Sequence, residues 1–587
     1  MCRIAGFIDP NRSSSDLIRM RDTMHRGGPD DAGIYIDLIT NVYLGHRRLS
    51  LIDLSDAGHQ PMSILDGKIQ IIYNGELYNF KEVKTELQLL GHSFRSHSDT
   101  EVILYAYLQW GTDCFNRFNG MYALALYDQR SNDLILARDH AGIKPLYYSI
   151  QNDKIYFASE IRAFKGLNPK WEVNADWKIY FLAFGHLPEP ITTLKNVQPL
   201  AKGSFLKFNA VTNKVTNTSF IPSHYKKKIL SQEEAQEKIN HTLNAAVQRH
   251  LISDAPIGLF LSGGIDSSLL TLLAQPYLGD QLKTLSIYFK EEKYSEKKYQ
   301  DIIIQKTGAH HQSFLVSAAD FNEYLPDVLS AMDQPSTDAI NTYFISKYAH
   351  EYALKAVLSG VGSDELFGGY PSMKQSAWYN RIKKIPSNLL ALAGHAPQDR
   401  YRKISHVQNK SSTGEYLFYR GLHDARTIAD ILNMEEDEVN TKLNALSPIQ
   451  WNGEDHEEKA SFLEYHLYMQ NQLLKDADYM SMWHSLEIRV PFLDRTLVDL
   501  VHTIPSSIRF DKNQAKGLLI DSFKNVLPEE IWNRPKQGFT FPFSTWLKEN
   551  DFAKPLNKME EKYFKKFQTG KMTWGRYWGI KLCDFYQ

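Results

Sequence analysis

The stretch Ser262-Gly263-Gly264-Ile265-Asp266-Ser267-Ser268 follows a short apolar run, Ile257 to Leu261, and precedes residues with helical spacing. Glycines at a strand-to-helix junction let backbone N–H groups face an anion, and the helix N-terminus adds its dipole. The stretch therefore predicts a phosphate cradle. It lacks the Gly-Lys-Ser/Thr ending of a Walker A loop and the spacing of a dinucleotide fingerprint, which excludes both of those sites.

Further strands and helices alternate after this loop. An apolar strand is expected at Leu282 to Phe289, a helix at Glu296 to Lys306 that stops at Gly308, and another strand at Gln312 to Val316. Strands that alternate with helices indicate a parallel sheet. A capping pattern at Ser231 to Glu234 begins the region, and the residues beyond about 375 have mostly helical spacing. We expect an α/β domain over residues 231–587, with a parallel sheet and a helical C-terminal part.

The N-terminal region has a different pattern. Short alternating apolar runs predict strands, whereas Phe80 to Leu90 and Thr100 to Gln109 have helical spacing. Residues 1–210 are therefore expected to form two β layers covered by helices. Apolar density falls over 211–230, which we interpret as a linker. The predicted strands are Ile69 to Tyr73, Tyr122 to Tyr127, Leu134 to Arg138, Ile155 to Ala158 and Ser204 to Phe208.

The composition is that of a globular protein. Among 587 residues, 67 Lys and Arg nearly balance 68 Asp and Glu, which gives no electrostatic footprint for nucleic acid or an anionic membrane. Three scattered cysteines cannot form a disulfide framework, and the chain has neither an apolar run of membrane-spanning length nor a signal-peptide pattern. We expect a cytoplasmic protein with small-molecule partners. Its oligomeric state stays open, with a homodimer as one option.

Cys2 directly follows the initiator Met, and a small second residue usually allows that Met to be removed. Cys2 would then carry a thiol nucleophile and a free α-amine. At pH 7 an amine with a pKa of ~7.8 is roughly 14% neutral, against about 0.04% for a lysine, so the α-amine is the better base. Such a cysteine can attack an amide and protonate the departing ammonia.

Several motifs follow Cys2 in order along the N-terminal region. They are His25-Arg26-Gly27-Gly28-Pro29-Asp30-Asp31, Arg48-Leu49-Ser50, Tyr73-Asn74-Gly75-Glu76-Leu77-Tyr78-Asn79, Ser98-Asp99-Thr100-Glu101, and Arg138-Asp139 with Lys144-Pro145-Leu146-Tyr147. Together with Cys2, these motifs strongly resemble the class II glutamine amidotransferase domain. The resemblance implies an αββα sandwich of the N-terminal-nucleophile (Ntn) hydrolase class.

The resemblance also implies the roles of the residues around Cys2. Glutamine presents a carboxylate and an ammonium, which a guanidinium and carboxylates can bind. By motif match, Arg48 binds the carboxylate, and Glu76 and Asp99 bind the ammonium. Asn74 and the Gly75 backbone N–H form the oxyanion hole.

The loop at Ser262 resembles the PP-loop of ATP pyrophosphatases, which cleave ATP between the α and β phosphates. Pyrophosphate release calls for a cation, and the resemblance implies Mg²⁺ held by Asp266 and Asp364. Asp364 lies in Leu358-Ser359-Gly360-Val361-Gly362-Ser363-Asp364-Glu365, a run that resembles the second signature of asparagine synthetases. By the same match, Lys516 reaches the α-phosphate. The remaining implied ATP contacts are Leu261, Ser262, Gly263, Gly264, Ser267, Ser268, Ile287, Ser359 and Gly360.

The segments Asp478 to Met482 and Glu487 to Asp494 match the helical core of that family, and we expect Arg489 and Asp494 to form an internal ion pair. The chain departs from the family pattern at Arg3, where Gly is common, and in the extra glycine of the His25 motif. These departures are expected to affect glutamine affinity. Val361 stands where an acidic residue is common, and we expect a water or Glu365 to replace that acid.

The resemblance covers essentially the whole chain and implies a glutamine-hydrolysing asparagine synthetase that uses ATP, Mg²⁺ and aspartate. A free-standing glutaminase would not need the loop at Ser262, and a non-catalytic relic would not be expected to retain both Cys2 and Asp266. The serious alternative keeps the chemistry and changes the acceptor to a sugar acid, such as a uronic acid, or to a secondary-metabolite acid. Val361 motivates this alternative.

Overall fold

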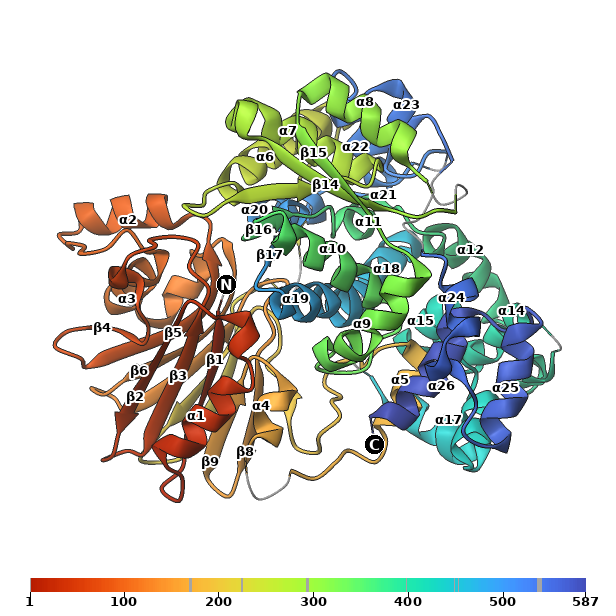
Figure 1. Cartoon of the computed structure of the whole chain (residues 1–587), viewed down its shortest axis with the longest axis horizontal. Coiled ribbons are helices and arrows are strands. Elements are labelled where there is room, and N and C mark those ends of the chain that lie inside the picture. The colour runs from red at the N-terminus through yellow and green to blue at the C-terminus, as the bar shows by residue number, and fades with distance from the viewer. Residues whose placement is uncertain are drawn as a thin grey trace.

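The computed structural model describes residues 2–167, 171–222, 225–291, 295–396, 398–447, 449–451, 453–511, 513–535 and 541–586. Figure 1 shows the antiparallel sheets of the N-terminal domain on the left and the helical C-terminal part on the right. The parallel sheet lies above and between them. Among the described residues, no helix combines the length and apolar character needed to cross a membrane.

The N-terminal domain contains two antiparallel sheets, each of six strands. The first has the order β10 (Gln198–Pro199), β8 (Tyr147–Gln151), β9 (Lys154–Ala158), β1 (Arg3–Ile8), β3 (Val42–Arg48) and β2 (Asp31–Asp37). The second has the order β12 (Val215–Ser219), β11 (Ser204–Asn209), β7 (Asp133–Arg138), β6 (Gly120–Asp128), β5 (Ile69–Leu77) and β4 (Met62–Ile64).

Helices cover the outer faces of these two sheets. Helices α1 (Ser14–Asp22) and α4 (Ile161–Lys165) share an apolar cluster with the first sheet, and α2 (Phe80–Leu89) and α3 (Asp99–Trp110) share another with the second. A third cluster joins the inner faces of both sheets. The predicted αββα sandwich is therefore confirmed.

The expected linker over 211–230 contains a strand. Residues of β12 pair with β11 from Ser204 opposite Ser219 to Phe208 opposite Val215, so the second sheet continues past residue 210. β12 is an edge strand whose residues are mostly exposed, and its polar sequence hid it from a search for apolar runs.

The second domain contains the predicted parallel sheet. Its order is β15 (His310–Leu315), β14 (Lys283–Tyr288), β13 (Ile257–Phe260), β16 (Ala356–Leu358) and β17 (Glu487–Arg489), and all neighbouring pairs are parallel. The expected helix signals are present as well. The Ser231 hydroxyl accepts a hydrogen bond from the Glu234 N–H at 3.1 Å, and Gly308 has φ +68°.

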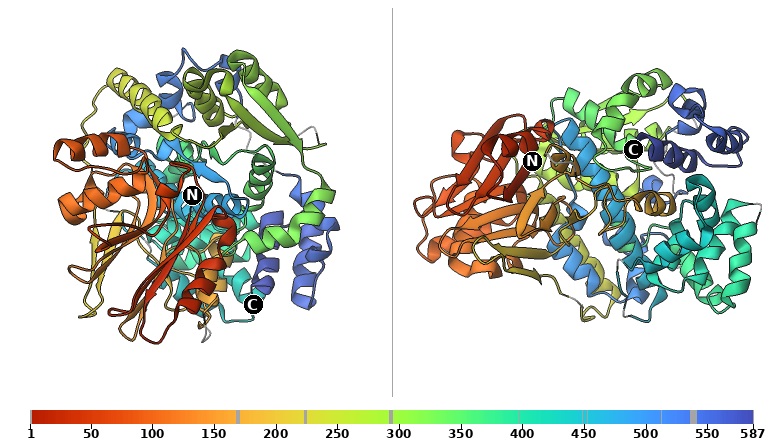
Figure 2. Two further views of the ribbon diagram at one scale, coloured as in Figure 1. Left: turned by 60° about the vertical axis from the view of Figure 1, so that its left-hand side comes forward. Right: turned by 90° about the horizontal axis from the view of Figure 1, so that it is seen from below.

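The helices of the second domain surround this sheet and continue into the C-terminal part (Figure 2). Helix α5 (Trp177–Phe184), although it precedes residue 210, packs in the apolar core of the C-terminal helices. The longer helices are α6 (Gln232–His250), α7 (Ile265–Leu278), α8 (Lys297–Thr307), α9 (Ala318–Ala331), α10 (Ile340–Glu351), α12 (Ser372–Ile382), α15 (Ser412–Arg420), α16 (Ala425–Leu432), α17 (Glu436–Ala445), α18 (His456–Leu463), α19 (Leu474–Trp483), α20 (Arg495–His502), α25 (Lys558–Gln568) and α26 (Trp574–Phe585).

Candidate active sites

Cys2 lies at the start of β1, and its side chain is buried. It lines a small cavity of about 30 Å³, and burial raises the pKa of its thiol. Four other residues predicted for the glutamine site line the same cavity, namely Arg48, Gly75, Glu76 and Asp99. The structure therefore brings together groups that lie as far as 97 positions apart in the sequence.

Asn74 and Gly75 lie on β5 beside the cysteine. The Asn74 side-chain oxygen accepts a hydrogen bond from the Cys2 N–H at 3.2 Å. Its amide nitrogen Nδ2 is buried and has no hydrogen-bond partner among the described residues, which leaves a donor free beside the nucleophile. A Cβ atom at Gly75 would lie 2.1 Å from the Met121 carbonyl oxygen, so this position accepts no larger side chain.

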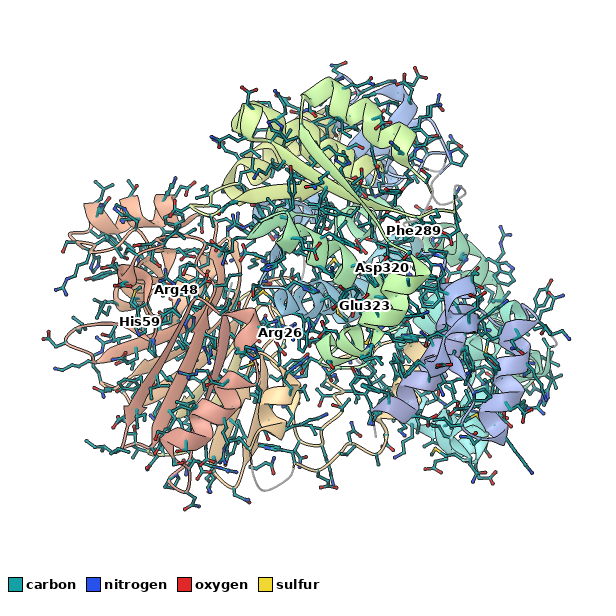
Figure 3. All side chains as sticks on the ribbon, in the orientation of Figure 1. Arg26, Arg48, His59, Phe289, Asp320 and Glu323 are labelled. Atoms are coloured by element: carbon teal, nitrogen blue, oxygen red, sulfur yellow. The ribbon has the colours of Figure 1, made fainter. Side chains whose placement is uncertain are left out.

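Arg48, at the end of β3, is held by the loop that follows it (Figure 3). Its guanidinium donates to the Ser55 carbonyl at 3.0 Å and to the Asp53 carbonyl. A Cβ atom at Gly58 would lie 1.9 Å from the nearer guanidinium nitrogen, so the absence of a side chain at Gly58 leaves room for Arg48. These contacts fix a cation at the wall of the cavity.

Two buried carboxylates complete this site. Asp99 accepts hydrogen bonds from the Leu77 N–H at 2.9 Å and the Tyr73 hydroxyl at 3.1 Å, and burial raises its pKa to about 6. Burial also raises the pKa of Glu76 well above the ordinary value. The Arg489 guanidinium of β17 lies 3.4 Å from the Glu76 carboxylate, so a group of the second domain reaches the first site.

A larger cavity of about 330 Å³ lies at the carboxyl ends of β13, β14 and β16. Gly263, Gly264 and Ser268 belong to the loop but do not line this cavity. Among the predicted ATP contacts, those that line it are Leu261, Ser262, Asp266, Ser267, Ile287, Ser359 and Gly360.

The loop after β13 is held by its own side chains. The Ser262 hydroxyl accepts a hydrogen bond from the Gly264 N–H at 3.2 Å and lies 3.0 Å from the Ser267 hydroxyl. Gly263 has φ +83°, a conformation that favours glycine. A Cβ atom at Gly360 would lie 2.6 Å from the Asp266 Cβ, so this glycine lets the two loops approach each other closely.

Lys516 joins the two predicted metal ligands. Its ammonium lies 2.7 Å from both the Asp266 and the Asp364 carboxylates, and its side chain is buried. Burial alone would lower the pKa of Lys516, but the two carboxylates raise it. Both carboxylates thus lie within reach of one cation. This pair fits Mg²⁺, which usually combines one or two carboxylates with phosphate oxygens and water.

Another part of this cavity wall was not predicted from the sequence. Asp338, Asn341 and Asp476 line the cavity together with Val361. Burial raises the pKa of Asp338 to about 6 and that of Asp476 well above its ordinary value. The Asn341 side-chain oxygen is buried and has no hydrogen-bond partner among the described residues. Asp338 precedes α10 and Asp476 lies in α19, and neither position belongs to a recognisable motif.

Two of our expectations for this region are wrong in part: Glu365 does not replace the acid at position 361, and Arg489 and Asp494 do not pair with each other. Glu365 does not line the cavity, because its carboxylate is buried and accepts a hydrogen bond from the Tyr370 hydroxyl at 2.8 Å. Arg489 and Asp494 do form internal ion pairs, but with different partners. Arg489 pairs with Glu487, and Asp494 pairs with Arg249 at 3.0 Å, because β17 and α20 direct these side chains to different neighbours.

Comparisons with known proteins agree with this architecture. The family model described as Asparagine synthase matches residues 238–565, and that described as Glutamine amidotransferase domain matches residues 1–221. Asparagine synthetase [glutamine-hydrolyzing] 1 of Bacillus subtilis (strain 168) is 31% identical and covers 93% of this chain and 88% of its own length. Asparagine synthetase [glutamine-hydrolyzing] 3 of the same organism is 29% identical, and the match covers 93% of this chain and 89% of that protein. A Gibberella zeae protein named Amidase chry2 is 25% identical, and the match covers 93% of this chain and 90% of that protein.

The double-sheet domain with its cysteine cavity and the parallel-sheet domain with its anion loop define a glutamine-dependent carbon–nitrogen ligase. The chain belongs to the asparagine synthase family.

Proposed function

We propose that the protein amidates a carboxylic acid, using ATP to activate the acid and glutamine as the source of ammonia. One observation carries the proposal: a single chain holds the Cys2 cavity and, separately, the Ser262 loop with its Asp266–Lys516–Asp364 cluster. Ammonia released at the first site would pass inside the protein to the second. This route protects ammonia from protonation by bulk water.

At the first site, we propose that the Cys2 thiol attacks the side-chain amide of glutamine once Met1 has been removed. Met1 lies outside the described residues. The free Asn74 Nδ2 and the Gly75 N–H would stabilise the oxyanion. The Cys2 α-amine would transfer a proton to the departing ammonia, and water would then cleave the thioester to give glutamate.

At the second site, an oxygen of the acceptor carboxylate would attack the α-phosphorus of ATP, and pyrophosphate would leave. Lys516 would stabilise the charge that develops at the α-phosphate. Asp266 and Asp364 would hold Mg²⁺, which supplies positive charge to the pyrophosphate. Ammonia would then attack the acyl carbon and displace AMP.

L-aspartate is the first acceptor to consider, because the curated Bacillus relatives are named asparagine synthetases. The cavity wall offers a place for its α-ammonium. Asp338 and Asp476 are carboxyl groups on that wall, and neither forms an ion pair with a lysine or arginine among the described residues. An ammonium bound beside them would favour their ionised form. Because Asp338 or Asp476 would pair with the α-ammonium, an apolar residue at position 361 would be tolerated.

A sugar acid or a secondary-metabolite acid is the second candidate, and the same wall favours it. Among the described residues that line the cavity, no lysine or arginine is present to bind the α-carboxylate of aspartate. An acceptor with hydroxyl groups instead of a second carboxylate would donate hydrogen bonds to Asp338, Asp476 and the Asn341 oxygen. The Gibberella relative, named an amidase, makes acceptors other than aspartate worth testing.

Three further properties belong to the proposal. The cysteines Cys2, Cys114 and Cys583 are buried and unpaired, which supports a reducing, cytoplasmic location. A glutaminase domain that ends after β12 and a synthetase domain that begins at about residue 231 would divide the chain. A homodimer remains the assembly to test by light scattering.

The decisive experiment measures pyrophosphate release from ATP with ammonium and a panel of acids that includes L-aspartate and uronic acids. Amide formation with release of AMP and pyrophosphate supports the proposal. Release of ADP and phosphate, or failure of the whole panel, contradicts it. The acid that gives the highest rate above the background without acceptor identifies the acceptor class.

A further inference from the structure

We propose that Arg3 is a positioning residue that couples glutamine hydrolysis at Cys2 to the state of the acceptor cavity. This inference rests on the proposed function and deepens it, because it assigns a control element to the same two sites. The connection runs from Cys2 through the Arg3 guanidinium to Asp478, on the helix that forms part of the cavity wall.

Arg3 immediately follows the nucleophile, and its side chain is completely buried. Its Nε donates to the Glu160 carboxylate at 2.6 Å, and another guanidinium nitrogen lies 2.8 Å from the Asp478 carboxylate. The Lys144 ammonium lies 3.2 Å from the other oxygen of Asp478. Two cations of the first domain therefore hold one carboxylate of the second.

Arg3 packs against Gly27, one of the two consecutive glycines of the His25 motif. A Cβ atom at Gly27 would lie 2.8 Å from both Cγ and Nε of Arg3. The long side chain at position 3 therefore occupies space that a side chain at position 27 would need. Neither Arg3 nor Gly27 lies among the residues that line the glutamine cavity.

Helix α19 separates Arg3 from the acceptor cavity. Asp476 and Ala477 line the cavity, whereas Asp478 contacts Arg3. Residues two positions apart in an α-helix point in directions about 200° apart, so opposite sides of α19 face the two regions. A second contact holds the end of this helix: the Arg26 guanidinium lies 4.1 Å from the centre of the Trp483 ring.

Figure 3 shows Arg26 at the edge of the N-terminal domain that faces α19. The Arg26 carbonyl also accepts a hydrogen bond from the Ser485 hydroxyl at 2.7 Å. Arg3 and Arg26 thus join the region around Cys2 to one helix.

A buried ion pair resists separation, because moving one partner away leaves the other charge buried without compensation. A shift of α19 when acceptor and ATP bind would therefore move Asp478 and Arg3 together. Arg3 is covalently joined to Cys2, so the shift would reach the nucleophile. Hydrolysis of glutamine would then be fast only when the activated acceptor is present to use the ammonia.

The test uses the full-length enzyme and measures glutamate and pyrophosphate from the same reaction. In the wild type, we expect ATP and acceptor to stimulate glutaminase activity, with a ratio of glutamate to pyrophosphate near one. In Arg3→Gln and Asp478→Asn, we expect this ratio to rise by about 5-fold or more, the lower end of typical couplings between sites. The ammonia-dependent rate should stay within about 2-fold of wild type, well below that coupling.

Two further variants make the result specific. Gly27→Ala displaces the Arg3 guanidinium without removing its charge and should give the same loss of coupling. Lys355→Ala breaks the Lys355–Asp30 ion pair, at 3.1 Å, which also joins the domains but does not include Arg3, and should leave the ratio unchanged. If Arg3→Gln fails to fold, as judged by its melting temperature, Gly27→Ala decides the question.

An unchanged ratio in folded Arg3→Gln and Gly27→Ala overturns the inference. Equal loss of the glutamine- and ammonia-dependent reactions in these variants also overturns it, because that result indicates a purely structural role. So does a wild-type glutaminase that neither ATP nor acceptor stimulates. Failure of the proposed function gives a different result, namely no pyrophosphate release by the wild type with any acid in the panel.

Discussion

The glutamine cavity and the acceptor cavity differ in how completely they are formed by the protein alone. The first is about 30 Å³, and its Arg48 and Asp99 side chains already form hydrogen bonds with the backbone. The second is about 330 Å³, and its Asp338 and Asp476 carboxyl groups form no ion pair with a lysine or arginine among the described residues. A site built for one invariant substrate can be closed in advance, whereas a site for ATP and an acceptor must keep polar groups free for them.

The comparison predicts its largest effect at Cys2. Cys2→Ala removes the nucleophile of the small cavity, so the glutamine-dependent reaction should be lost while the ammonia-dependent reaction continues. Cys2→Ser should also fail with glutamine, because a hydroxyl is a weaker nucleophile and ionises far less readily than a thiol. Product formation with glutamine and with ammonium chloride checks this, and equal loss of both activities refutes the division of labour.

The next effect concerns the proposed metal-binding pair beside the larger cavity, of which Asp266 lines the cavity. Asp266→Asn or Asp364→Asn removes a charge that would hold Mg²⁺ and that contacts Lys516. We expect a loss of about 10²-fold or more in pyrophosphate release, comparable with the loss of one electrostatic transition-state contact. Initial rates across a Mg²⁺ titration measure the effect.

Lys516→Ala provides a related but separate prediction. It should slow adenylation and leave the glutaminase activity of Cys2 largely unchanged. Its matched control is Lys355→Ala, an exposed lysine at the domain boundary. Normal pyrophosphate release by Lys516→Ala would contradict the role assigned to this ammonium.

The sequence predicted the small cavity better than the large one, and the reason is physical. Residues such as Arg48 and Asp99 belong to motifs fixed by the chemistry of glutamine, and both line the predicted cavity. Asp338 lies just before α10 and Asp476 lies in α19, neither in a local pattern, so only the packing of α10 against α19 brings them to one wall. Likewise, only the fold reveals that Gly27 leaves room for Arg3.

A smaller effect separates the two acceptor candidates. A lost charge-assisted contact is worth roughly 1.5–3 kcal/mol, or about 10- to 150-fold in efficiency. If aspartate is the acceptor, Val361→Glu should improve kcat/KM for aspartate by no more than that range, and Asp476→Asn should lower it. Pyrophosphate release with aspartate at background level, together with turnover of a uronic acid, would assign the acceptor to the sugar-acid class.

The smallest expected effect is a pH dependence that distinguishes the two cavities. Burial raises the pKa of Asp99 from its ordinary value to about 6, so the carboxyl is protonated below pH 6 and cannot bind the glutamine ammonium as an anion. Because kcat/KM reports the ionisation of the free enzyme and the Cys2 α-amine must be neutral to act as the base, kcat/KM for glutamine should fall by up to about tenfold per pH unit below ~7.8. Below pH 6 the protonation of Asp99 adds a second factor, so the fall should steepen to about 100-fold per pH unit. The control is kcat/KM for the acceptor with ammonia, at a constant concentration of neutral ammonia, which should show no inflection from Asp99 because Asp99 does not line the acceptor cavity.

Asp99→Asn should lower the efficiency with glutamine and remove the inflection near pH 6. An inflection that persists in that variant would assign the titration to another group, and Glu76, whose pKa burial also raises, is the first to test.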